Sequence, residues 1–532
     1  MRPMTNARSD APADPMDVPA NPMDLGIFFF ASSEGGDDAR DGYRLILEAA
    51  RFADRRGFAS LWMPERHFHA FGGLSPNPAL LAATLATHTE RISLRSGSVV
   101  VPLHHPARVV EEWSVVDQLS GGRVELGVAA GWFPDDFVLV DGGYEERKDI
   151  LVDRIHQIRS LWRGEPLRAV NGVGDEVEVR TVPRPVQAEV PLWLTAAMSP
   201  DSFRQAGELG THILTHLLFQ GIDQLAERIQ EYRAAWREAG HPGEGQVSVM
   251  VHTHVTDRDE GIRELVRGPM KQYLGSSVSL AQRYLQSLPI FRDNPELSVA
   301  GLSAEAVDTA LEYSFERYFR TSGLFGSPEA CLPLLARLSA IGVDEVGCLV
   351  DFGLPVDQVL EALEPLDRLR KLAAEPRELA EALPTPAEIA AVAPPDREPL
   401  GYASPLPVAP TGGAAAPSVG VATASTPAVA EMERVLSALW SELLEQDRVD
   451  PETNFFELGA HSLLAVRAVE QLRERTGRSV EVVDLFRFPT VRSLAQHLAG
   501  DADGEEEGMD EARARAARRR GARPGAERRT RR

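Results

Sequence analysis

The sequence predicts an α/β protein whose main part is a (β/α)8 TIM-like barrel, followed by a small all-α domain of four helices. Three observations support this prediction. Eight short apolar runs alternate with helix-like stretches over residues 24–375, an Ala/Pro-rich stretch follows at 376–428, and a compact amphipathic segment occupies 429–500. Strands alternating with helices are typical of a parallel sheet, and eight such units in about 350 residues favour a closed barrel over an open doubly wound sheet.

Each of the eight expected strands is a short, mainly apolar run. They are residues 23–30, 60–64, 92–101, 123–131, 191–197, 211–216, 246–255 and 344–352. Between them, residues 44–57 and 108–122 carry apolar residues at helical spacing and end at glycine, a common signal for the end of a helix. Longer insertions follow the fourth and seventh strands, and on a barrel such loops usually build or cover the active site.

The bulk composition narrows the class of protein. The chain has 532 residues, of which 43% are hydrophobic, enough for a sizeable core, and its formal net charge is −23. Such an acidic chain argues against nucleic acid as a general partner. Two cysteines make neither a disulfide framework nor a metal cluster, so we expect no metal site and a cytoplasmic location. The first apolar run is too short to span a membrane. Residues 1–23 and 501–532 are expected to be disordered tails.

A run near the carboxyl end carries the sharpest local signal. The segment NFFELGAHSLLAVRAV, residues 454–469, reads as a loop followed by a helix that begins at Ser462. The inner face of this helix is expected to carry Leu463, Val466 and Val469. A serine at a helix start exposes its hydroxyl beside unpaired backbone N–H groups, which favour an anion such as a phosphodiester. A simple helix cap would use the same residue type.

The whole segment 429–500 resembles the peptidyl carrier domains of nonribosomal peptide synthesis. The resemblance rests on a first helix EMERVLSALWSELL, the loop DRVDPETNFFELG, the Ser462 helix and the closing run DLFRFPTVRSLAQHL. It implies that Ser462 carries a 4'-phosphopantetheine arm attached by a phosphopantetheinyl transferase. Ala460 stands where the family more often has glycine, and His461 is the form usual in nonribosomal peptide carriers.

Three further motifs lie at expected strands of the barrel. They are LWMPERHFHAFGG (61–73), SGSVVVPLHHPARVVEEWSVVDQLSGGRVELGVAAGW (96–132) and VPLWLTAAMSPDSF (190–203). Together with the segment 323–353 they resemble the luciferase-like flavin monooxygenases, specifically the branch found beside natural-product assembly lines, over roughly residues 24–370. The resemblance implies that reduced FMN from a flavin reductase binds at the top of the barrel and reacts with O2, and that a flavin hydroperoxide delivers one oxygen atom.

The segment from Glu65 to His69 supplies the expected catalytic residues, which are Arg66, His67 and His69. The luciferases have Glu-His-His-Phe here, and their first histidine, which is assigned a catalytic role, is replaced by Arg66. Arg66 is too basic to shuttle a proton, so we expect it to bind an anionic group of the substrate arm or the flavin. His67 or His69 is expected to control the protonation of the hydroperoxide. The alternative is that this loop only caps the barrel.

The residues expected to bind the flavin combine small side chains with backbone donors. Gly97–Ser98 lies within a strand where close approach of the ring needs a small residue, and the matching dipeptide of the luciferases forms a non-prolyl cis bond beside the flavin. Ser199 and Pro200 open a helix whose unpaired N–H groups suit the FMN phosphate, although a bare helix start looks the same. The expected flavin-binding set is Glu65, Gly97, Ser98, Ala130, Thr195, Ala197 and Ser199.

Aromatic and histidine side chains at strand ends are further candidates for lining a pocket. Bulky indoles exclude water from a reactive site, and plain core packing is the alternative for each of them. The candidate tryptophans are Trp62, Trp113, Trp132 and Trp193. The candidate histidines are His104 and His105, as loop or pocket-lining residues, and His252 and His254, on one face of a strand.

The two parts of the chain together predict a function. A tethered carrier presents its thioester to the barrel at high effective concentration. We therefore expect an FMN-dependent, O2-using monooxygenase that hydroxylates an aminoacyl or acyl group held on Ser462, in nonribosomal peptide or hybrid natural-product biosynthesis. Adenylation or other assembly-line enzymes are expected to load and unload the carrier, and the enzyme is expected to be a homo-oligomer. Two alternatives stay open: a deazaflavin-dependent oxidoreductase of the same barrel superfamily, and a non-catalytic carrier or docking module.

Overall fold

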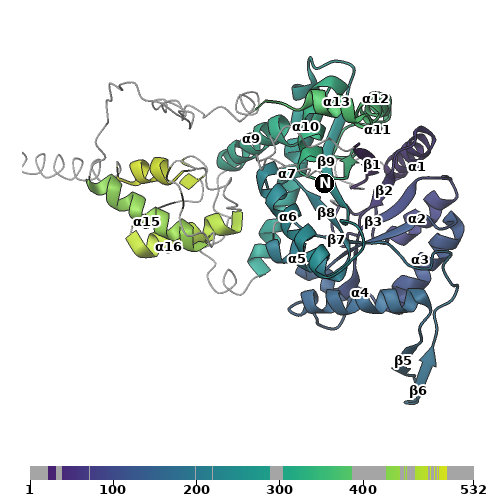
Figure 1. The fold of residues 1–532 in the computed structure, drawn as a ribbon. Helices are drawn as coiled ribbons and strands as arrows, with labels where there is room; N and C mark the ends of the chain where they lie inside the picture. The colour runs from purple at the N-terminus through teal and green to yellow at the C-terminus, as the bar shows by residue number, and fades with distance from the viewer. Residues whose placement is uncertain are drawn as a thin grey trace, which may run out of the picture. The chain divides into compact units, whose positions relative to one another are not determined.

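The chain divides into two compact units, with residues 1–292 and 311–395 in the first and 293–310 and 396–532 in the second. The first unit contains a closed barrel of parallel strands surrounded by helices (Figure 1). No helix in the described part of the chain is long and apolar enough to cross a bilayer. The computed structural model describes residues 22–30, 39–70, 72–197, 199–218, 220–287, 304–385, 427–443, 449, 451, 462–476, 478, 480, 484–485, 488 and 490–499.

All eight expected strands form in the barrel. They are β1 (Asp24–Phe28), β2 (Ser60–Met63), β3 (Ser93–Val100), β4 (Val124–Ala129), β7 (Leu192–Thr195), β8 (His212–His216), β9 (Val247–Val255) and β11 (Glu345–Leu349). Adjacent strands pair in parallel, and because β11 pairs with β1 and β8 pairs with β9, the sheet closes on itself. The prediction of a (β/α)8 barrel is therefore confirmed. A short extra strand, β10 (Leu324–Gly326), also pairs with β9.

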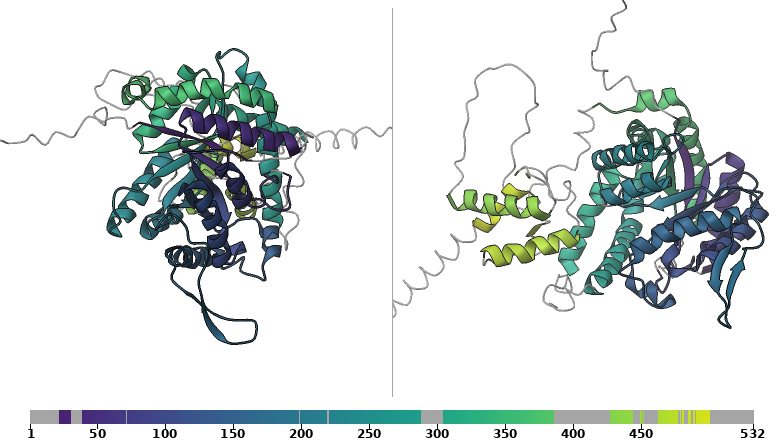
Figure 2. Two further views of the ribbon diagram at one scale, coloured as in Figure 1. Left: turned by 90° about the vertical axis from the view of Figure 1, so that its right-hand side faces the viewer. Right: turned by 60° about the horizontal axis from the view of Figure 1, so that its bottom comes forward.

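Helices connect the strands and surround the barrel (Figure 2). They are α1 (Ala39–Arg56), α2 (Pro78–Ala86), α3 (Pro106–Ser120), α4 (Arg147–Arg163), α5 (Pro200–Leu209), α6 (Ile222–Glu238), α7 (Ile262–Ser287), α9 (Ala304–Thr321), α10 (Pro328–Ala340), α11 (Val356–Glu361), α12 (Leu363–Ala373) and α13 (Pro376–Ala382), with the 3-10 helices η2 (Val101–Leu103) and η3 (Pro134–Leu139).

Two of these helices were predicted from their apolar spacing, and glycine follows each of them. Gly57 follows α1 and Gly121 follows α3, both with the positive φ that glycine adopts readily. Helix α1 begins at Ala39, five residues before the predicted start at residue 44. Its first turn is mostly exposed and polar, so the apolar spacing gives no sign of it.

The insertion after β4 contains a two-stranded hairpin that the sequence did not predict. Strands β5 (Leu167–Val170) and β6 (Glu176–Val179) pair antiparallel and extend away from the barrel (Figure 1). Most of their side chains are exposed, so they lack the apolar pattern of a core strand. The insertion after β9 holds α7, α9 and β10. Both long insertions therefore lie where the sequence placed them.

Helix α13 occupies the first residues of the segment predicted to be a linker. Its side chain Leu379 is fully buried in the core of the barrel unit. The barrel unit therefore continues to residue 382, seven residues past the predicted boundary at 375. A single apolar residue in a short helix is too weak a pattern to predict from composition.

The described part of the second unit consists mainly of helices. It contains α15 (Pro427–Leu443), α16 (Ser462–Thr476) and a helical stretch at residues 491–499, and residues 484–485 are helical as well. Helix α16 begins at Ser462 as predicted, and Val469 lies in the core. The side chains of Leu463 and Val466 lie outside the described residues, and the number of four helices stays a prediction. The core of this unit includes Met432, Leu436, Leu439, Trp440, Ala468, Val469, Leu472, Val491 and Leu494.

A buried ionic network occupies the amino-terminal end of the barrel. The guanidinium of Arg95 on β3 lies 2.6 Å from a carboxylate oxygen of Glu345 on β11 and 2.9 Å from one of Glu125 on β4. Burial lowers the pKa of Arg95, but the two carboxylates outweigh it and raise the pKa above its ordinary value. The carboxylates are further bonded by four polar side chains from three other strands: Ser60 and Trp62 on β2, Trp193 on β7 and Ser248 on β9.

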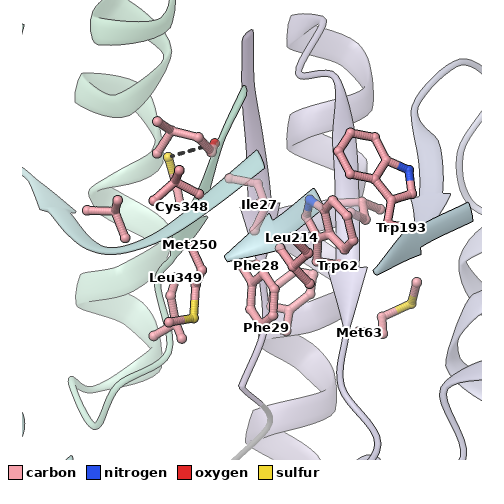
Figure 3. Packing of buried hydrophobic residues seen from close by; sticks show 14 of the residues in the cluster. Ile27, Phe28, Phe29, Trp62, Met63, Trp193, Leu214, Met250, Cys348 and Leu349 are labelled. Carbon is pink, nitrogen blue, oxygen red and sulfur yellow. Dashed lines mark hydrogen bonds between the residues drawn. The ribbon is translucent and has the colours of Figure 1, made fainter. Parts of the chain in front are cut away.

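Aromatic side chains, among them Phe28, Trp62 and Trp193, pack with aliphatic residues in the interior of the barrel (Figure 3). The rings of Phe28 and Trp62 lie 6.1 Å apart, and those of Trp62 and Trp193 meet edge to face at 5.4 Å. Both indoles are almost fully buried and also stack on Arg95. For Trp62 and Trp193, therefore, the core-packing alternative holds.

Replacing Arg95 by Met should destabilise the barrel. The substitution leaves two buried carboxylates without their counter-charge, and breaking a buried ion pair in this way typically costs about 3–5 kcal/mol. We expect a loss of that size in the free energy of unfolding. Urea denaturation followed by tryptophan fluorescence measures it, because Trp62 and Trp193 lie against the guanidinium.

The matched control is Arg168→Ala on the exposed hairpin. Arg168 forms an ion pair with Glu178 at 2.8 Å that lies at the surface. Surface pairs contribute about 0–1 kcal/mol, so this variant should unfold close to the wild-type midpoint. Equal midpoints for the Arg95 and Arg168 variants would show that the network does not stabilise the barrel.

Candidate active site

Polar side chains gather at the opposite, carboxyl-terminal end of the strands. In a parallel barrel all strands end on the same face, and the loops there form the active site of enzymes with this fold. The loops after β2 and β4, the ends of β3, β7 and β9, and the two helices of the insertion after β9 supply these residues. Most residues of the predicted site lie on these segments.

Glu65, two residues after β2, holds two imidazoles. Its side chain is 1% exposed, and Oε1 lies 2.9 Å from Nε2 of His67 and 2.6 Å from Nε2 of His104. Oε2 accepts a hydrogen bond from the backbone N–H of Val100 at 2.9 Å. Burial raises the pKa of Glu65, but the bonds from His104 and His67 outweigh it and hold the pKa below its ordinary value. Glu65 is therefore a carboxylate that anchors the loop after β2 to β3.

His104 is the partner of Glu65 that the sequence did not reveal. The two residues are 39 positions apart and come from the loops after different strands. Burial lowers the pKa of His104, but the hydrogen bond and charge of Glu65 outweigh it, so the pKa lies above its ordinary value. The sequence placed His104 near the pocket without a carboxylate partner, because nothing local marks this contact.

The guanidinium of Arg66 lies against two aromatic rings. Its Cζ is 5.9 Å from the ring centre of Phe30 and 5.5 Å from that of Trp132. Its Nε is buried and has no hydrogen-bond partner in the described part of the chain. Burial lowers the pKa of Arg66, whereas the nearby carboxyl of Asp136 and the hydroxyl of Tyr273 act to raise it.

Asp136 carries a charge that acts on Arg66, and sequence reasoning missed this residue. It lies in η3 after β4, is 6% exposed, and its Oδ1 is buried without a partner among the residues described. Burial raises the pKa of Asp136 to about 6, although Arg66 and His67 pull it down. The sequence could have pointed to Asp136 only through its place in the insertion after the fourth strand, because the active site of a barrel is commonly built from such loops.

Buried aromatic and imidazole groups line the mouth beside β9. Nδ1 of His252 lies 2.9 Å from the hydroxyl of Tyr318 on α9, and its Nε2 has no partner among the described residues. The ring of His252 lies 4.4 Å from that of Tyr273 on α7, which in turn meets Phe30 at 5.2 Å. Burial lowers the pKa of His252 to about 3, so the imidazole is neutral at neutral pH. The insertion after β9 therefore closes this side of the mouth.

Three adjacent strands bring the predicted flavin-binding residues together. The peptide bond between Gly97 and Ser98 on β3 is cis, as the resemblance implied. The Ser98 hydroxyl is hydrogen-bonded to that of Thr195 at the end of β7, across the intervening strand β4, which Ala130 follows. Gly127 on β4 makes this approach possible, because a Cβ there would lie 2.1 Å from the Ser96 carbonyl oxygen and 3.4 Å from Ser98 Oγ.

The remaining predicted residues follow β7 and β2. Thr195 and Ala197 are exposed at the end of β7, and Ser199 is the N-cap of α5 with Pro200 at its first position, as predicted. The Ser199 side chain makes no capping hydrogen bond. His69 is half-buried in the loop after β2.

Comparison with known proteins identifies the family. Residues 23–345 match the luciferase-like monooxygenases, and residues 434–498 match a phosphopantetheine attachment site. The first match spans more than half of the chain, so the chain belongs to the luciferase-like monooxygenases, a family of flavin-dependent monooxygenases. It also carries a phosphopantetheine attachment domain. The predictions of this family and of the attachment domain are confirmed, while the nonribosomal peptide type of the carrier stays a prediction.

Individual relatives agree with this assignment. The chain is 25% identical over 329 residues to the oxygenase component of flavin-dependent trigonelline monooxygenase from Acinetobacter baylyi, covering 60% of this chain and 87% of that protein. It is 33% identical over 235 residues to 4-hydroxyprotoasukamycin monooxygenase from Streptomyces nodosus subsp. asukaensis, covering 42% and 62% respectively. The oxygenating constituent of 3,6-diketocamphane monooxygenase from Pseudomonas putida, solved with FMN, has a TM-score of 0.52 at 21% identity, over 68% of this chain and 99% of that one, which supports the fold.

Glu65→Gln should lower the pKa of His104. The amide keeps the shape of the side chain but removes the charge that raises this pKa, while the burial that lowers it remains. The stability that the protein gains from the His104–Glu65 contact is full below the ordinary pKa of histidine and is lost as the pH rises through the raised pKa. The variant should therefore also lose this pH dependence of its stability.

Histidine-resolved NMR titration measures the change. The exposed His88, whose ring is hydrogen-bonded to Thr84 and Thr87, is the internal control, and its signals should be the same in both proteins. An unaltered His104 titration in the variant would rule out Glu65 as the cause of its raised pKa.

Proposed function

We propose that the protein is an FMN-dependent monooxygenase that hydroxylates an aminoacyl or acyl group held as a thioester on a 4'-phosphopantetheine arm at Ser462. The observation that carries the proposal is the presence in one chain of the luciferase-like barrel at 23–345 and the attachment domain at 434–498. Tethering a substrate to its enzyme raises the effective concentration to the mM range when the linker is flexible. The fusion therefore favours the carrier-bound group as the substrate.

The residues at the mouth fit a bound FMN. Ser98, Ala130 and Thr195 present small side chains at the ends of three adjacent strands, which suits the approach of a flat ring. The hydroxyl of Ser199, which makes no capping bond, lies at the start of α5, where the positive end of the helix dipole suits a phosphate. Reduced FMN would supply the activation of O2 and the transfer of one oxygen atom.

The protein's own residues exclude water and position a proton. His252, Tyr273 and Tyr318 wall the mouth with buried side chains, and a water-poor site suppresses unproductive side reactions. Nε2 of His67 faces the carboxylate of Glu65, so it carries the proton of the neutral ring and leaves Nδ1 to accept or release one. We assign proton transfer to Nδ1 of His67, with His69 as the alternative.

The proposal includes three kinds of partner. A flavin reductase supplies reduced FMN, and a phosphopantetheinyl transferase modifies Ser462. Adenylation or other assembly-line enzymes load the carrier and remove the oxidised product. Their involvement follows from the chemistry, since the oxygenation consumes reduced flavin and a loaded arm.

His67→Gln should slow turnover without preventing flavin binding. Loss of a general acid or base typically lowers kcat about 10²–10⁴-fold, and the pH dependence of kcat should flatten at the same time. Steady-state rates over a pH series measure both effects. His88→Gln, far from the mouth and exposed, should leave rate and profile unchanged. A variant that keeps the wild-type pH profile would move the proton-transfer role to His69.

Intact-protein mass spectrometry tests the substrate. Ser462 is converted to the pantetheinylated form, loaded with candidate aminoacyl and acyl groups, and mixed with FMN, a reductase and O2. The loaded arm should gain the mass of one oxygen atom, and omitting the reductase or O2 should abolish the gain. Isotopically heavy O2 identifies the source of the atom.

A soluble thioester supplies the matched comparison. The same acyl group, offered as a free pantetheine thioester at about 10 μM to the Ser462→Ala protein, should react about 10- to 100-fold more slowly than the tethered group, because tethering corresponds to mM concentrations. Equal rates for the tethered group and the free amino acid would contradict the proposal. So would oxygenation of soluble substrates alone.

A further inference from the structure

Two charged side chains at the mouth of the barrel each have a buried polar atom without a hydrogen-bond partner among the described residues. In the described chain neither Nε of Arg66 nor Oδ1 of Asp136 has a hydrogen bond. A buried polar group without a partner destabilises the protein by roughly the free energy of a lost hydrogen bond, and more when it is charged. Arg66 comes from the loop after β2 and Asp136 from η3 after β4. Arg66 stacks on Trp132, which lies shortly before η3, and each of the two charges alters the pKa of the other, so the two side chains lie near each other.

Each group is held by its own packing and not by the other. The charges of Arg66 and Asp136 alter each other's pKa, yet no ion pair joins these two described side chains. Arg66 is fixed between the rings of Phe30 and Trp132, and its stem packs so close to Gly72 that a Cβ there would lie 3.3 Å from it. Two opposite charges that are near but not paired leave bonding capacity for a third group.

The third group must offer both an acceptor and a donor. A guanidinium only donates hydrogen bonds, and a carboxylate only accepts them. An α-aminoacyl thioester carries a carbonyl oxygen and a positively charged α-amino group on neighbouring carbons. A simple acyl thioester has the carbonyl oxygen alone.

We propose that Arg66 and Asp136 recognise the α-aminoacyl end of the tethered substrate, with Arg66 donating to the thioester carbonyl oxygen and Asp136 accepting from the α-ammonium group. The inference rests on the proposed function and narrows its substrate class to thioesters with a free α-amino group. Asp136 supplies the selectivity, because an acyl or N-acylated substrate leaves its buried carboxylate without a cationic partner.

The location of the pair suits a substrate that arrives on an arm. Trp132, which stacks on Arg66, is 41% exposed, so the pair lies where the mouth opens to solvent. The predicted flavin residues Ser98 and Thr195 lie on β3 and β7, on either side of the strand that leads to η3. Asp136 is therefore placed next to the strands that carry the flavin-binding residues, without belonging to them.

Binding of soluble arm analogues tests the inference without turnover. The probes are L-alanyl, L-leucyl and L-phenylalanyl pantetheine amides, which replace the labile thioester, and their des-amino counterparts. Each is titrated calorimetrically into the Ser462→Ala protein in the presence of FMN. At least one aminoacyl probe should bind about 10-fold or more tightly than its des-amino counterpart, since a charge-assisted hydrogen bond is lost.

Substitutions assign the discrimination to the pair. Asp136→Asn should reduce the preference for the amino group to less than about 3-fold, whereas Asp135→Asn, at the exposed neighbouring carboxylate, should leave it unchanged. Arg66→Lys should weaken both members of a probe pair similarly, because both present the carbonyl oxygen. FMN affinity, measured alongside, should stay within about 3-fold of wild type in all variants.

The outcomes separate this inference from the proposed function. Absence of binding by every aminoacyl probe, equal binding of both probe types, or a preference that survives Asp136→Asn would overturn the inference. Loss of FMN affinity with the preference intact would assign the pair to the flavin and overturn it as well. A preference for the amino group combined with no oxygen gain on the loaded arm would uphold the inference and refute the proposed oxygenation. The comparison of aminoacyl and des-amino probes uses an unaltered barrel, so it does not depend on whether any variant of Arg66 or Asp136 folds.

Discussion

The positive charge of Arg95, buried between Glu125 and Glu345, constrains the whole barrel. Arg95 and Glu345 are 250 residues apart, and they meet only when β11 returns to pair with β1 and close the sheet. A buried charge without its partner is strongly unfavourable, so an open sheet that separated them would lose far more than one hydrogen bond. Closing the sheet therefore also brings the charges together. Trp62 and Trp193 donate hydrogen bonds to the two carboxylates, so the packing of the apolar core depends on the same network.

Placing this network at the amino-terminal end leaves the carboxyl-terminal end for chemistry. Among the described residues there, Arg66, Asp136 and His252 each have a buried polar atom without a hydrogen-bond partner. Glu65 is the exception, because it binds two imidazoles and a backbone N–H. It gives the loop after β2 a fixed position, while its neighbours keep the bonding capacity that a ligand requires.

Arginine in place of the first luciferase histidine changes what this loop can do. A guanidinium stays protonated and donates hydrogen bonds from a planar group, so it suits recognition better than proton transfer. In the proposed function the proton passes to His67, and Arg66 joins Asp136 in holding the substrate. The exposed Trp132 beside them belongs to the insertion after β4, so one loop contributes to both the entrance and the recognition site.

The sequence by itself determined the eight barrel strands, the start of α16 at Ser462 and the family, because these depend on apolar runs and on motifs that are contiguous in the chain. The cis bond at Gly97–Ser98 also followed from a local motif. Only the tertiary structure decided that Glu65 binds His104, that Arg66 lies near Asp136, and that α13 joins the barrel core. Those contacts arise from side-chain directions in loops that the closed barrel brings together, and no local pattern encodes such distances.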